Sequence, residues 1–401
     1  MTDEHRALSA TKSQELALAL GPTRAVAAAV SARAAHTLCY GLAGTALLHA
    51  CLGDATTAVR HWNAASQVLG DAPADGIHTG PGALAASLII GTAHLPERGP
   101  HHALAPRATS WLSARAQALA QLQRTSPGSW APWAVYDAIK GLSGIGRILL
   151  VSHATGHRAE ATPGLHAALT TLIRMILTDQ GTRPGWWLPA HAHPPSVPVP
   201  PSGAATTGMA HGIAGPLAFL ALAHLAGHIA PGQHDAIAGA AHWLLTWADP
   251  GPSWPPHVSG ADLDAGPTPP PGVIPGRRTA WCYGTPGIAT ALTHAGHALG
   301  EPAFLRTATA ALDHLATDIS TWDTEGPGLC HGAAGVLAGA RHGGSRLAAR
   351  ARDTVLSLLS PPSAAPGLLG GRAGTALALA ADAGLFARQR AAPWESVLLI
   401  S

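Results

Sequence analysis

Short, nearly uncharged segments alternate along the chain with longer segments of helical period. The segment from Tyr40 reads YGLAGTALLHA, and the segment from His211 reads HGIAGPLAFLALA. Each begins with a small loop of the form Gly-x-x-Gly and continues as a run of apolar residues. Because an uncharged helix has no polar face to show to water, these segments are expected to be helices buried on all sides.

The glycine loop occurs seven times, and each copy is followed by an apolar run. The second glycines of the copies are Gly44, Gly82, Gly144, Gly215, Gly287, Gly335 and Gly374. Only the second copy departs from the form, with Thr79 in place of the first glycine. Such self-similarity is the signature of a repeat architecture, in which each repeat is one supersecondary unit.

The longer segments between the copies have the period of amphipathic helices. In PGLHAALTTLIRMIL, the large apolar residues that share one face are Leu165, Leu169, Leu172 and Ile176. Helix starts are also readable: Asp54 suits an N-cap, Pro302 suits a first helical turn, and Ser345 is a further cap candidate. The chain is therefore predicted to alternate a buried helix with an amphipathic one.

We expect an all-α fold, an α/α barrel (toroid) of about seven inner and seven outer helices with the glycine turns at one rim. The whole chain, residues 1–401, would form this single domain. A linear solenoid is the competing arrangement. A closed ring is favoured because the inner segments have almost no polar face to present to solvent. The glycines let the chain turn with positive φ and let helix ends approach closely.

Two long Pro-rich stretches interrupt the alternation, at 184–203 and 249–276. Loops of such length are usually functional or disordered. Each leads into a glycine turn, so in a barrel both would lie at the rim of those turns. Two interpretations are open at this point: the stretches wall a pocket, or they are disordered tethers.

Composition and charge exclude several classes of function. Hydrophobic residues make up 47% of the chain, charged residues 11%, and the formal net charge is +2. This charge gives no electrostatic reason to expect nucleic acid or an anionic membrane as a partner. The N-terminus lacks the basic-then-apolar order of a secretory signal. The uncharged stretch 209–230 is long enough to span a bilayer, but its histidines and its Gly-Pro break favour a buried helix.

Three of the four cysteines, Cys39, Cys282 and Cys330, lie just before glycine turns. Cys282 and Cys330, with His331 next to the latter, offer two thiolates and an imidazole. Scattered cysteines are no disulfide framework, and an intracellular chain keeps them reduced. In a barrel, residues that precede the glycines of different copies converge. Two thiolates, one imidazole and an open position are the pattern of a catalytic zinc site. Two core cysteines and a hydrogen-bonded histidine are the competing interpretation.

The motifs WCYGTPG at 281–287 and CHGAAG at 330–335, with AHGIAGPL upstream, resemble the lanthionine synthetase C-like family of lanthipeptide cyclases. Through the seven repeats the resemblance covers essentially the whole chain. It implies an α/α barrel with one zinc ion per chain, held at the matching positions by Cys282, Cys330 and His331. It also implies the reaction, in which a cysteine thiol of a dehydrated precursor peptide adds to dehydroalanine or dehydrobutyrine and closes a thioether ring.

The resemblance implies four further site residues: His211 in AHGIAG, Asp137 in YDAIKGLSG, Arg278 and Tyr283. His211 would act as a general acid or a general base, and Asp137 would orient it. Arg278 would hold Asp137 or the developing oxyanion. Structural roles compete with these assignments, namely a helix cap for His211, a helix start for Asp137 and a packed ring for Tyr283. The neighbouring Arg277 leaves open which arginine points inward.

Three other features are expected to be structural. Cys39 occupies in the first copy the position of Cys282, yet the resemblance gives it no ligand role. Cys39 and Cys51 are therefore predicted to lie in the core. His191 and His193 have a spacing that occurs in metal sites, but within a Pro-rich stretch we expect them to be exposed.

The leading hypothesis is a stand-alone cyclase in the cytoplasm, peripheral at most to a membrane-associated biosynthetic complex and not an integral membrane protein. Its expected partners are a dehydrated precursor peptide with its leader, a separate dehydratase and a transporter. A glycosidase is one alternative, but it needs two carboxylates at the rim, and of Asp137, Asp262, Asp264, Asp323 and Glu325 only Asp137 abuts a glycine turn. A prenyltransferase-like enzyme and a non-catalytic peptide-binding protein of the same family are the others.

Overall fold

The computed structural model describes residues 3–96, 99–125, 130–178, 181–195, 197–251, 253–267, 278–317, 319–359, 365–386 and 391–401. Within these ranges the chain forms the helices α1 to α17, five short 3-10 helices and one small sheet. Apart from the sheet, this content is the all-α fold that the sequence predicts.

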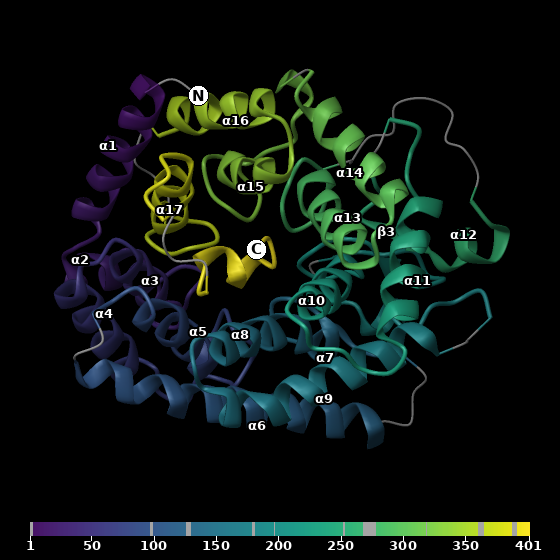
Figure 1. Cartoon of the computed structure of the whole chain (residues 1–401), viewed down its shortest axis with the longest axis horizontal. Coiled ribbons are helices and arrows are strands. Elements are labelled where there is room, and N and C mark those ends of the chain that lie inside the picture. The colour runs from purple at the N-terminus through teal and green to yellow at the C-terminus, as the bar shows by residue number, and fades with distance from the viewer. Residues whose placement is uncertain are drawn as a thin grey trace.

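An inner ring of helices is formed by the apolar segments that follow the glycine turns. Its members are α3 (Leu42–Cys51), α5 (Gly80–Thr92), α8 (Leu142–Ala154), α10 (Ala214–Leu225), α13 (Thr285–Leu299), α15 (Ala333–Gly339) and α17 (Arg372–Asp382). Each packs on the next in chain order, and α17 packs on α3 again (Figure 1). The ring closes, so the barrel prediction is confirmed and the linear solenoid is excluded.

An outer ring of amphipathic helices surrounds the inner one (Figure 1). Its members are α1 (Asp3–Ala19), α4 (Ala55–Gln67), α6 (Leu104–Thr125), α9 (Arg158–Leu177), α11 (Gln233–Thr246), α14 (Pro302–Leu315) and α16 (Ser345–Ser357). The first outer helix, α1, packs on the last inner helix, α17, while each other outer helix packs on the inner helix that precedes it. The N-terminal segment therefore completes the last repeat.

Two of the three predicted helix starts are confirmed. The Asp54 side chain caps α4 by accepting a hydrogen bond of 3.0 Å from the Thr57 amide, and Pro302 is the first residue of α14. Ser345 is not a cap: it is the first residue of α16, and Gly344 holds the N-cap position without a side-chain bond. Gly344 has the extended backbone that an N-cap requires, so the helix begins one residue earlier than predicted.

The second glycine of every turn is required by a close approach of the backbone. A Cβ on Gly44 would overlap the carbonyl oxygen of Leu38, six positions earlier. The same clash, with a carbonyl oxygen closer than 3.0 Å, recurs in all seven copies, where the carbonyls belong to Leu38, Gly76, Ala138, Met209, Trp281, Leu329 and Leu368. Glycine alone lets the start of each inner helix pack this tightly on the loop that leads into it.

A three-stranded antiparallel sheet, which the sequence does not predict, is built mainly from the two Pro-rich stretches. Its strands are β1 (Trp187–Leu188), β2 (Ala204–Thr206) and β3 (His257–Ser259), in the order β1-β2-β3. In register, Trp187 pairs with Ala205, and Ala205 pairs with Val258. β3 continues into α12 (Gly260–Ala265), and residues 268–276 lie outside the described part of the chain.

The remaining helical pieces are short. They are α2 (Thr23–Ala28), α7 (Trp133–Tyr136) and the 3-10 helices η1 (Pro100–Ala103), η2 (Ala190–Ala192), η3 (Ile319–Thr321), η4 (Ala340–His342) and η5 (Trp394–Leu398). Of these, α7 leads into the third glycine turn, and η5 belongs to a C-terminal segment inside the ring (Figure 1).

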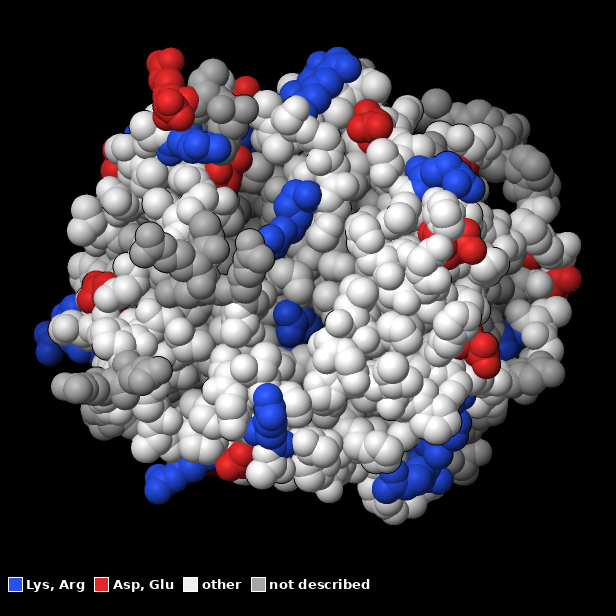
Figure 2. Space-filling view, viewed as in Figure 1, with Lys and Arg blue, Asp and Glu red and all other residues white. Residues whose placement is uncertain are grey.

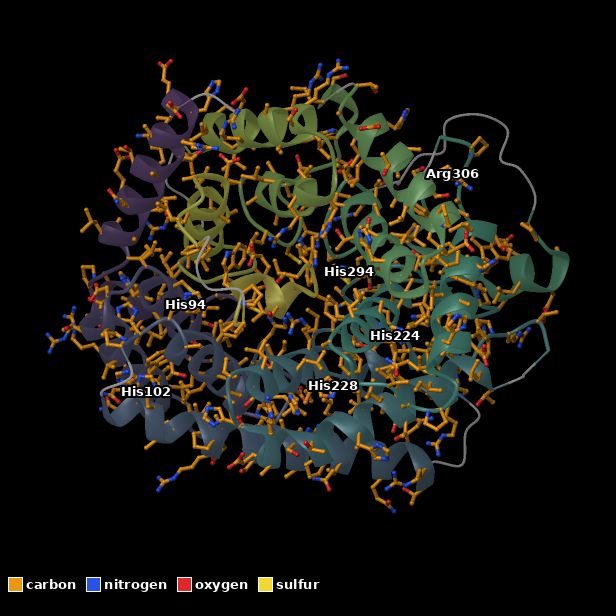
Figure 3. The ribbon with its side chains drawn as sticks, viewed as in Figure 1. His94, His102, His224, His228, His294 and Arg306 are labelled. Carbon is orange, nitrogen blue, oxygen red and sulfur yellow. The ribbon has the colours of Figure 1, made fainter. Side chains whose placement is uncertain are left out.

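The C-terminal segment, residues 391–401, lies in the middle of the ring of inner helices (Figure 1). Its buried apolar side chains are Trp394, Val397, Leu398, Leu399 and Ile400. His94 Nε2 lies 2.7 Å from the Ala392 carbonyl oxygen, and Arg147 Nε donates to the Ser401 carbonyl oxygen at 2.7 Å. His94 and His294 lie on either side of the segment (Figure 3). Side chains from several repeats therefore contact the same C-terminal segment.

The surface seen in Figure 2 carries few charges, and the coloured side chains of both signs are scattered over it. Among the described residues, no helix has the length and apolar character needed to cross a bilayer. The uncharged stretch 209–230 contains the inner helix α10, whose residues are largely buried in the ring, as predicted.

Candidate metal centre and proton-transfer pair

The seven glycine turns are joined to one another by backbone hydrogen bonds. The links run from Leu38 N to His78 O, Ile77 N to Ile139 O, Ala138 N to Ala210 O, Ala210 N to Cys282 O, Cys282 N to Cys330 O, Cys330 N to Leu369 O and Leu369 N to Cys39 O. The last link returns to the first turn, so the bonds close a circle at the N-terminal rim of the inner helices. Residues far apart in sequence are thereby held side by side.

Cys282, Cys330 and His331 form the one group of possible metal ligands found in the described residues. Their ligand atoms all lie within 4.8 Å of one another. Cys282 is buried, and the other two are partly exposed. Tetrahedral zinc with bonds of about 2.3 Å to sulfur would set its two sulfurs about 3.8 Å apart, a spacing that fits this group. Two thiols and an imidazole also match zinc in their chemistry.

The two sulfurs of this group share one negative charge more easily than either would carry it alone. The hydrogen bond between the two thiols lowers the pKa of Cys282 and raises the pKa of Cys330. The contact with Cys282 also raises the pKa of His331. This group of side chains therefore favours a thiolate even without a bound metal ion.

His211, which is partly exposed, pairs with the buried Asp137 in the turn next to Cys282. His211 Nδ1 lies 2.6 Å from Asp137 Oδ2, and the Asp137 side chain is fully buried. The other carboxylate oxygen accepts hydrogen bonds from the backbone amides of Ile139, Lys140 and Gly141 at 3.1, 2.6 and 2.9 Å. Because a carboxylate only accepts, His211 donates from Nδ1 and keeps Nε2 for other partners.

The circle of turns explains why this pair lies beside the cysteines. Asp137 precedes the third glycine turn, His211 belongs to the fourth, Cys282 to the fifth, and Cys330 to the sixth. Each of these turns is hydrogen-bonded to the next, through Ala138 to Ala210 at 3.0 Å, Ala210 to Cys282 at 3.1 Å and Cys282 to Cys330 at 3.4 Å. Four consecutive turns therefore supply the whole candidate site.

Tyr283 follows Cys282 and faces His211, with 6.1 Å between the ring centroids. Burial raises the pKa of Tyr283, so its phenol stays protonated. Its hydroxyl oxygen is buried without a hydrogen-bond partner among the described residues. A buried donor without a partner suggests a site that a ligand completes.

Arg278 is not placed on Asp137, one of the two roles that the sequence suggested. Its guanidinium lies 3.8 Å from an Asp323 oxygen and 3.3 Å from a Glu325 oxygen. In the described residues the Asp137 carboxylate is bonded to His211 and to three backbone amides, and Arg278 is not among its partners. Glu325, which the sequence did not connect with a glycine turn, is held there by a 2.7 Å bond from its amide to the His331 carbonyl. Arg277 lies outside the described residues.

Aligning the turns shows residues that the motifs alone missed. Four positions before the second glycine, where His211 and His331 stand, the first two copies carry Tyr40 and His78. Tyr40 is 49% exposed. His78 is fully buried, and burial lowers its pKa to about 3. The shared position in the repeat was the signal that could have placed these side chains at the rim.

Three structural assignments made from the sequence can be compared with the fold. Cys39 and Cys51 are buried in the core, as predicted. His191 is exposed as predicted, but His193 is buried, and its ring meets the indole of Trp133 edge-on at 5.6 Å. The expectation for His193 is wrong because the Pro-rich stretch around it packs against Trp133, and this contact buries the His193 side chain.

Comparison with known proteins identifies a family that the chain matches and a solved structure that it resembles. The family described as Lanthionine synthetase C-like protein matches residues 23–342 of the chain. No curated protein matches the sequence. The solved structure of "Nisin cyclase" is similar, with a TM-score of 0.75 and 18% sequence identity over 98% of this chain and 98% of its own. At this identity the likeness shows that the two chains share a fold.

Proposed function

The chain belongs to the lanthionine synthetase C-like family, and from this membership we propose that it is a zinc-dependent lanthipeptide cyclase. Its substrate would be a precursor peptide that contains cysteine and dehydroalanine or dehydrobutyrine. The thiol sulfur bonds to the β-carbon of the dehydro residue, and a proton is added at the α-carbon. The thiol supplies the sulfur and one proton, so the reaction needs no oxidant or reductant.

The observation that supports this proposal most directly is the convergence of Cys282, Cys330 and His331 beside the His211–Asp137 pair. Ligand atoms from two distant motifs lie within 4.8 Å of one another. His211, the residue proposed to move the proton, lies in the adjacent turn of the circle. A protein that only bound peptide would need neither a thiolate-forming group nor a histidine held at one nitrogen.

Cys282, Cys330 and His331 would hold the metal, one ion per chain. When bound there, zinc supplies a Lewis acid that favours the thiolate form of a substrate cysteine at neutral pH. The three residues leave room in a tetrahedral set for a fourth, external ligand.

His211 is the residue proposed to move the proton. Its Nδ1 is bonded to Asp137 at 2.6 Å, so Nε2 is the atom that exchanges a proton with the thiol or with the α-carbon. Asp137 fixes the tautomer and stabilises the imidazolium form, and it stays an acceptor throughout. The side chain of His211 is 25% exposed, which gives it access to a bound peptide.

Tyr283 and Arg278 are proposed to stabilise charge on the peptide. Attack at the β-carbon places negative charge on the carbonyl oxygen of the dehydro residue. The Tyr283 hydroxyl is a buried donor without a partner in the described residues, and it lies next to Cys282 in sequence. Arg278 is 38% exposed and pairs with Glu325, whose amide bonds the His331 carbonyl at 2.7 Å, and it would act on the developing oxyanion rather than on Asp137.

The two-carboxylate chemistry of a glycosidase is not favoured by the described carboxylates. Asp137 is fully buried and bonded at both oxygens. Asp323 and Glu325 share Arg278. Asp264 accepts from Thr182 and Arg183 on the surface. An acid and a base facing each other across a pocket, which glycoside hydrolysis needs, are not among these pairs.

The proposed partners follow from the proposed reaction. The peptide must already be dehydrated, so a separate dehydratase would act before this enzyme, and a transporter would act on the product. We propose that ring closure takes place in the cytoplasm, where thiols stay reduced, with the enzyme at most peripheral to a membrane-associated complex. A leader on the precursor would keep the peptide bound while its rings close.

Zinc content and ring closure in the purified protein test the proposal. We expect about one zinc ion per chain, and loss of free thiols when the protein is incubated with a dehydrated cysteine-containing peptide. Cys282→Ala and Cys330→Ala should each lose metal and ring closure, whereas Cys39→Ala, a cysteine at the equivalent repeat position, should keep both. Full zinc content in the Cys282→Ala/Cys330→Ala double variant would overturn the metal assignment.

The same assay separates the metal from the proton-transfer group. His211→Ala should keep its zinc and close rings at least about 100-fold more slowly, because general acid–base catalysis contributes about 10² to 10⁴ in rate. A reaction without protein gives the rate of spontaneous addition. Unchanged ring closure by zinc-loaded His211→Ala would show that this histidine does not move the proton.

A further inference from the structure

We propose that Trp133 is a positioning residue that holds the imidazole plane of His211 in the orientation needed for proton transfer. This inference rests on the proposed function of His211. Trp133 belongs to α7 and comes four residues before Asp137. It does not occur in any of the glycine turns, and nothing in the cysteine motifs points to it.

The indole of Trp133 lies face to face with the imidazole of His211. The ring centroids are 4.6 Å apart, and the planes differ by 15°. Trp133 itself is 8% exposed, so it is a wall of the site and has little surface to offer to a peptide. Stacked contacts of this kind depend on geometry, and they favour one ring orientation over others.

Trp133 and Asp137 are one helical turn apart, and both side chains contact the same imidazole ring, that of His211. Residues four apart lie on the same face of a helix, and the Asp137 amide donates to the Trp133 carbonyl at 3.0 Å. Trp133 therefore contacts the face of the imidazole while Asp137 binds its edge at Nδ1. The sequence WAVYD at 133–137 encodes both contacts.

The two contacts restrain different motions of the imidazole. A single hydrogen bond at Nδ1 fixes the direction of one atom but leaves the ring free to tilt about that bond. The stack removes this tilt. The backbone of the same residue is also held, because Thr206 Oγ1 donates to the His211 carbonyl at 2.5 Å and the Tyr136 hydroxyl does so at 3.3 Å. With the backbone, the edge and the face all held, Nε2 points in one direction.

Trp133 is in turn supported by the first Pro-rich stretch. The buried ring of His193 meets the indole at 90° with 5.6 Å between centroids. The strand β2, which ends at Thr206, connects this stretch to the turn that carries His211. The Pro-rich stretch supports His211 through Trp133, and the strand β2 that follows it supports His211 through Thr206, so this part of the chain has a role in shaping the site.

Trp133→Leu and Trp133→Phe test the inference in full-length, zinc-loaded protein. Leu removes the aromatic face, and we expect kcat for ring closure to fall about 10- to 100-fold with KM and zinc content nearly unchanged, since small misplacement of a reacting group is that costly. Phe keeps an aromatic face and should restore most of the rate. Trp62→Leu is the matched control, because Trp62 is 4% exposed in a separate cluster.

A measurement that does not need activity completes the test. In protein with ¹³C-labelled histidine, the His211 ring signals, assigned with the His211→Ala variant, should show a ring-current shift from the indole. The shift should be lost in Trp133→Leu, largely kept in Trp133→Phe and unchanged in Trp62→Leu.

The two measurements separate failure of the inference from failure of the proposed function. An inactive wild type with a normal ring-current shift would contradict the cyclase and leave the stack in place. An active wild type together with an equally active Trp133→Leu variant would overturn the positioning role. A His211 signal that does not respond to Trp133→Leu would overturn the stack itself.

Discussion

At the scale of single residues, neighbours decide what a side chain at a given repeat position can do. Cys39, Cys282 and Cys330 occupy the same position in their turns. Burial raises the pKa of Cys39 to about 12, whereas the hydrogen bond with Cys330 lowers the pKa of Cys282. One cysteine is a core residue and the other is a candidate ligand because only the second has a sulfur partner.

Buried histidines give the first prediction at this scale, which concerns pH. Burial lowers the pKa of His78 and of His294 to about 3, with further lowering by the charges of His211 near the first and of His342 and Arg147 near the second. In the unfolded chain both titrate near pH 6.5. Between about pH 6.5 and 3 the unfolded state binds protons that the folded state does not, so the free energy of unfolding falls as the pH falls.

Urea unfolding at pH 7.5 and 5.5 measures this effect. Each of the two histidines contributes up to about 1.4 kcal/mol per pH unit below 6.5. His294→Leu should reduce the pH dependence, whereas His234→Leu, at a side chain that is 69% exposed, should leave it as in the wild type. Equal slopes for both variants and the wild type would rule out this origin of acid sensitivity.

At the scale of elements, the glycine turn is a packing unit. Its second glycine leaves room for the carbonyl group of the residue six positions earlier. This close backbone contact places the loop directly over the start of the inner helix. Because the contact is local, each turn can form it without the others. In five of the seven links both residues stand five positions before the second glycine of their turn, so one hydrogen-bond pattern runs through most of the circle.

Gly44→Ala tests the packing unit away from the proposed metal ligands. Its Cβ would overlap the Leu38 carbonyl oxygen and lie 2.8 Å from the Leu368 amide nitrogen of the last repeat. Overpacking of this kind costs about 1–3 kcal/mol or more, so the urea midpoint should fall. Gly239→Ala in α11, where a Cβ would meet nothing within 4 Å, should instead raise stability by about 0.5–1 kcal/mol. Two variants that shift the midpoint alike would refute the packing explanation.

At the scale of the whole molecule, closure depends on both ends of the described chain. The helix α1 covers α17, and the C-terminal segment fills the ring from inside (Figure 1). The Trp281 indole donates to the Leu398 carbonyl at 2.8 Å, so this segment also touches the residue next to Cys282. The C-terminal segment therefore links the middle of the ring to the candidate metal site.

Leu398→Ala measures how much this segment stabilises the ring. Leu398 is fully buried, and truncation of such a side chain costs about 2–5 kcal/mol. The matched control is Leu385→Ala, since Leu385 is 47% exposed and surface substitutions usually change stability by less than about 0.5 kcal/mol. Thermal unfolding should separate the two variants clearly. A Leu398→Ala protein as stable as the control would mean that the ring stands without its C-terminal segment.

Much of this fold was determined by local sequence. The alternation of buried and amphipathic helices follows from hydrophobic period, and six of the seven turns were marked by glycines at both loop positions. The single cap that was misplaced, at Ser345, and the unpredicted sheet both involve backbone whose conformation depends on what packs against it. Local pattern does not contain that information.

The sequence by itself determined which residue types stand at the turns, because those positions are fixed by helix period and by a glycine contact only six residues long. Only the tertiary structure decided which of them meet. Cys282 meets Cys330 because their turns are neighbours in the hydrogen-bonded circle, while Cys39 is separated from Cys330 by Leu369. The stack of Trp133 on His211, and the pairing of Arg278 away from Asp137, likewise depend on contacts between segments distant in the chain, which no local periodicity can specify.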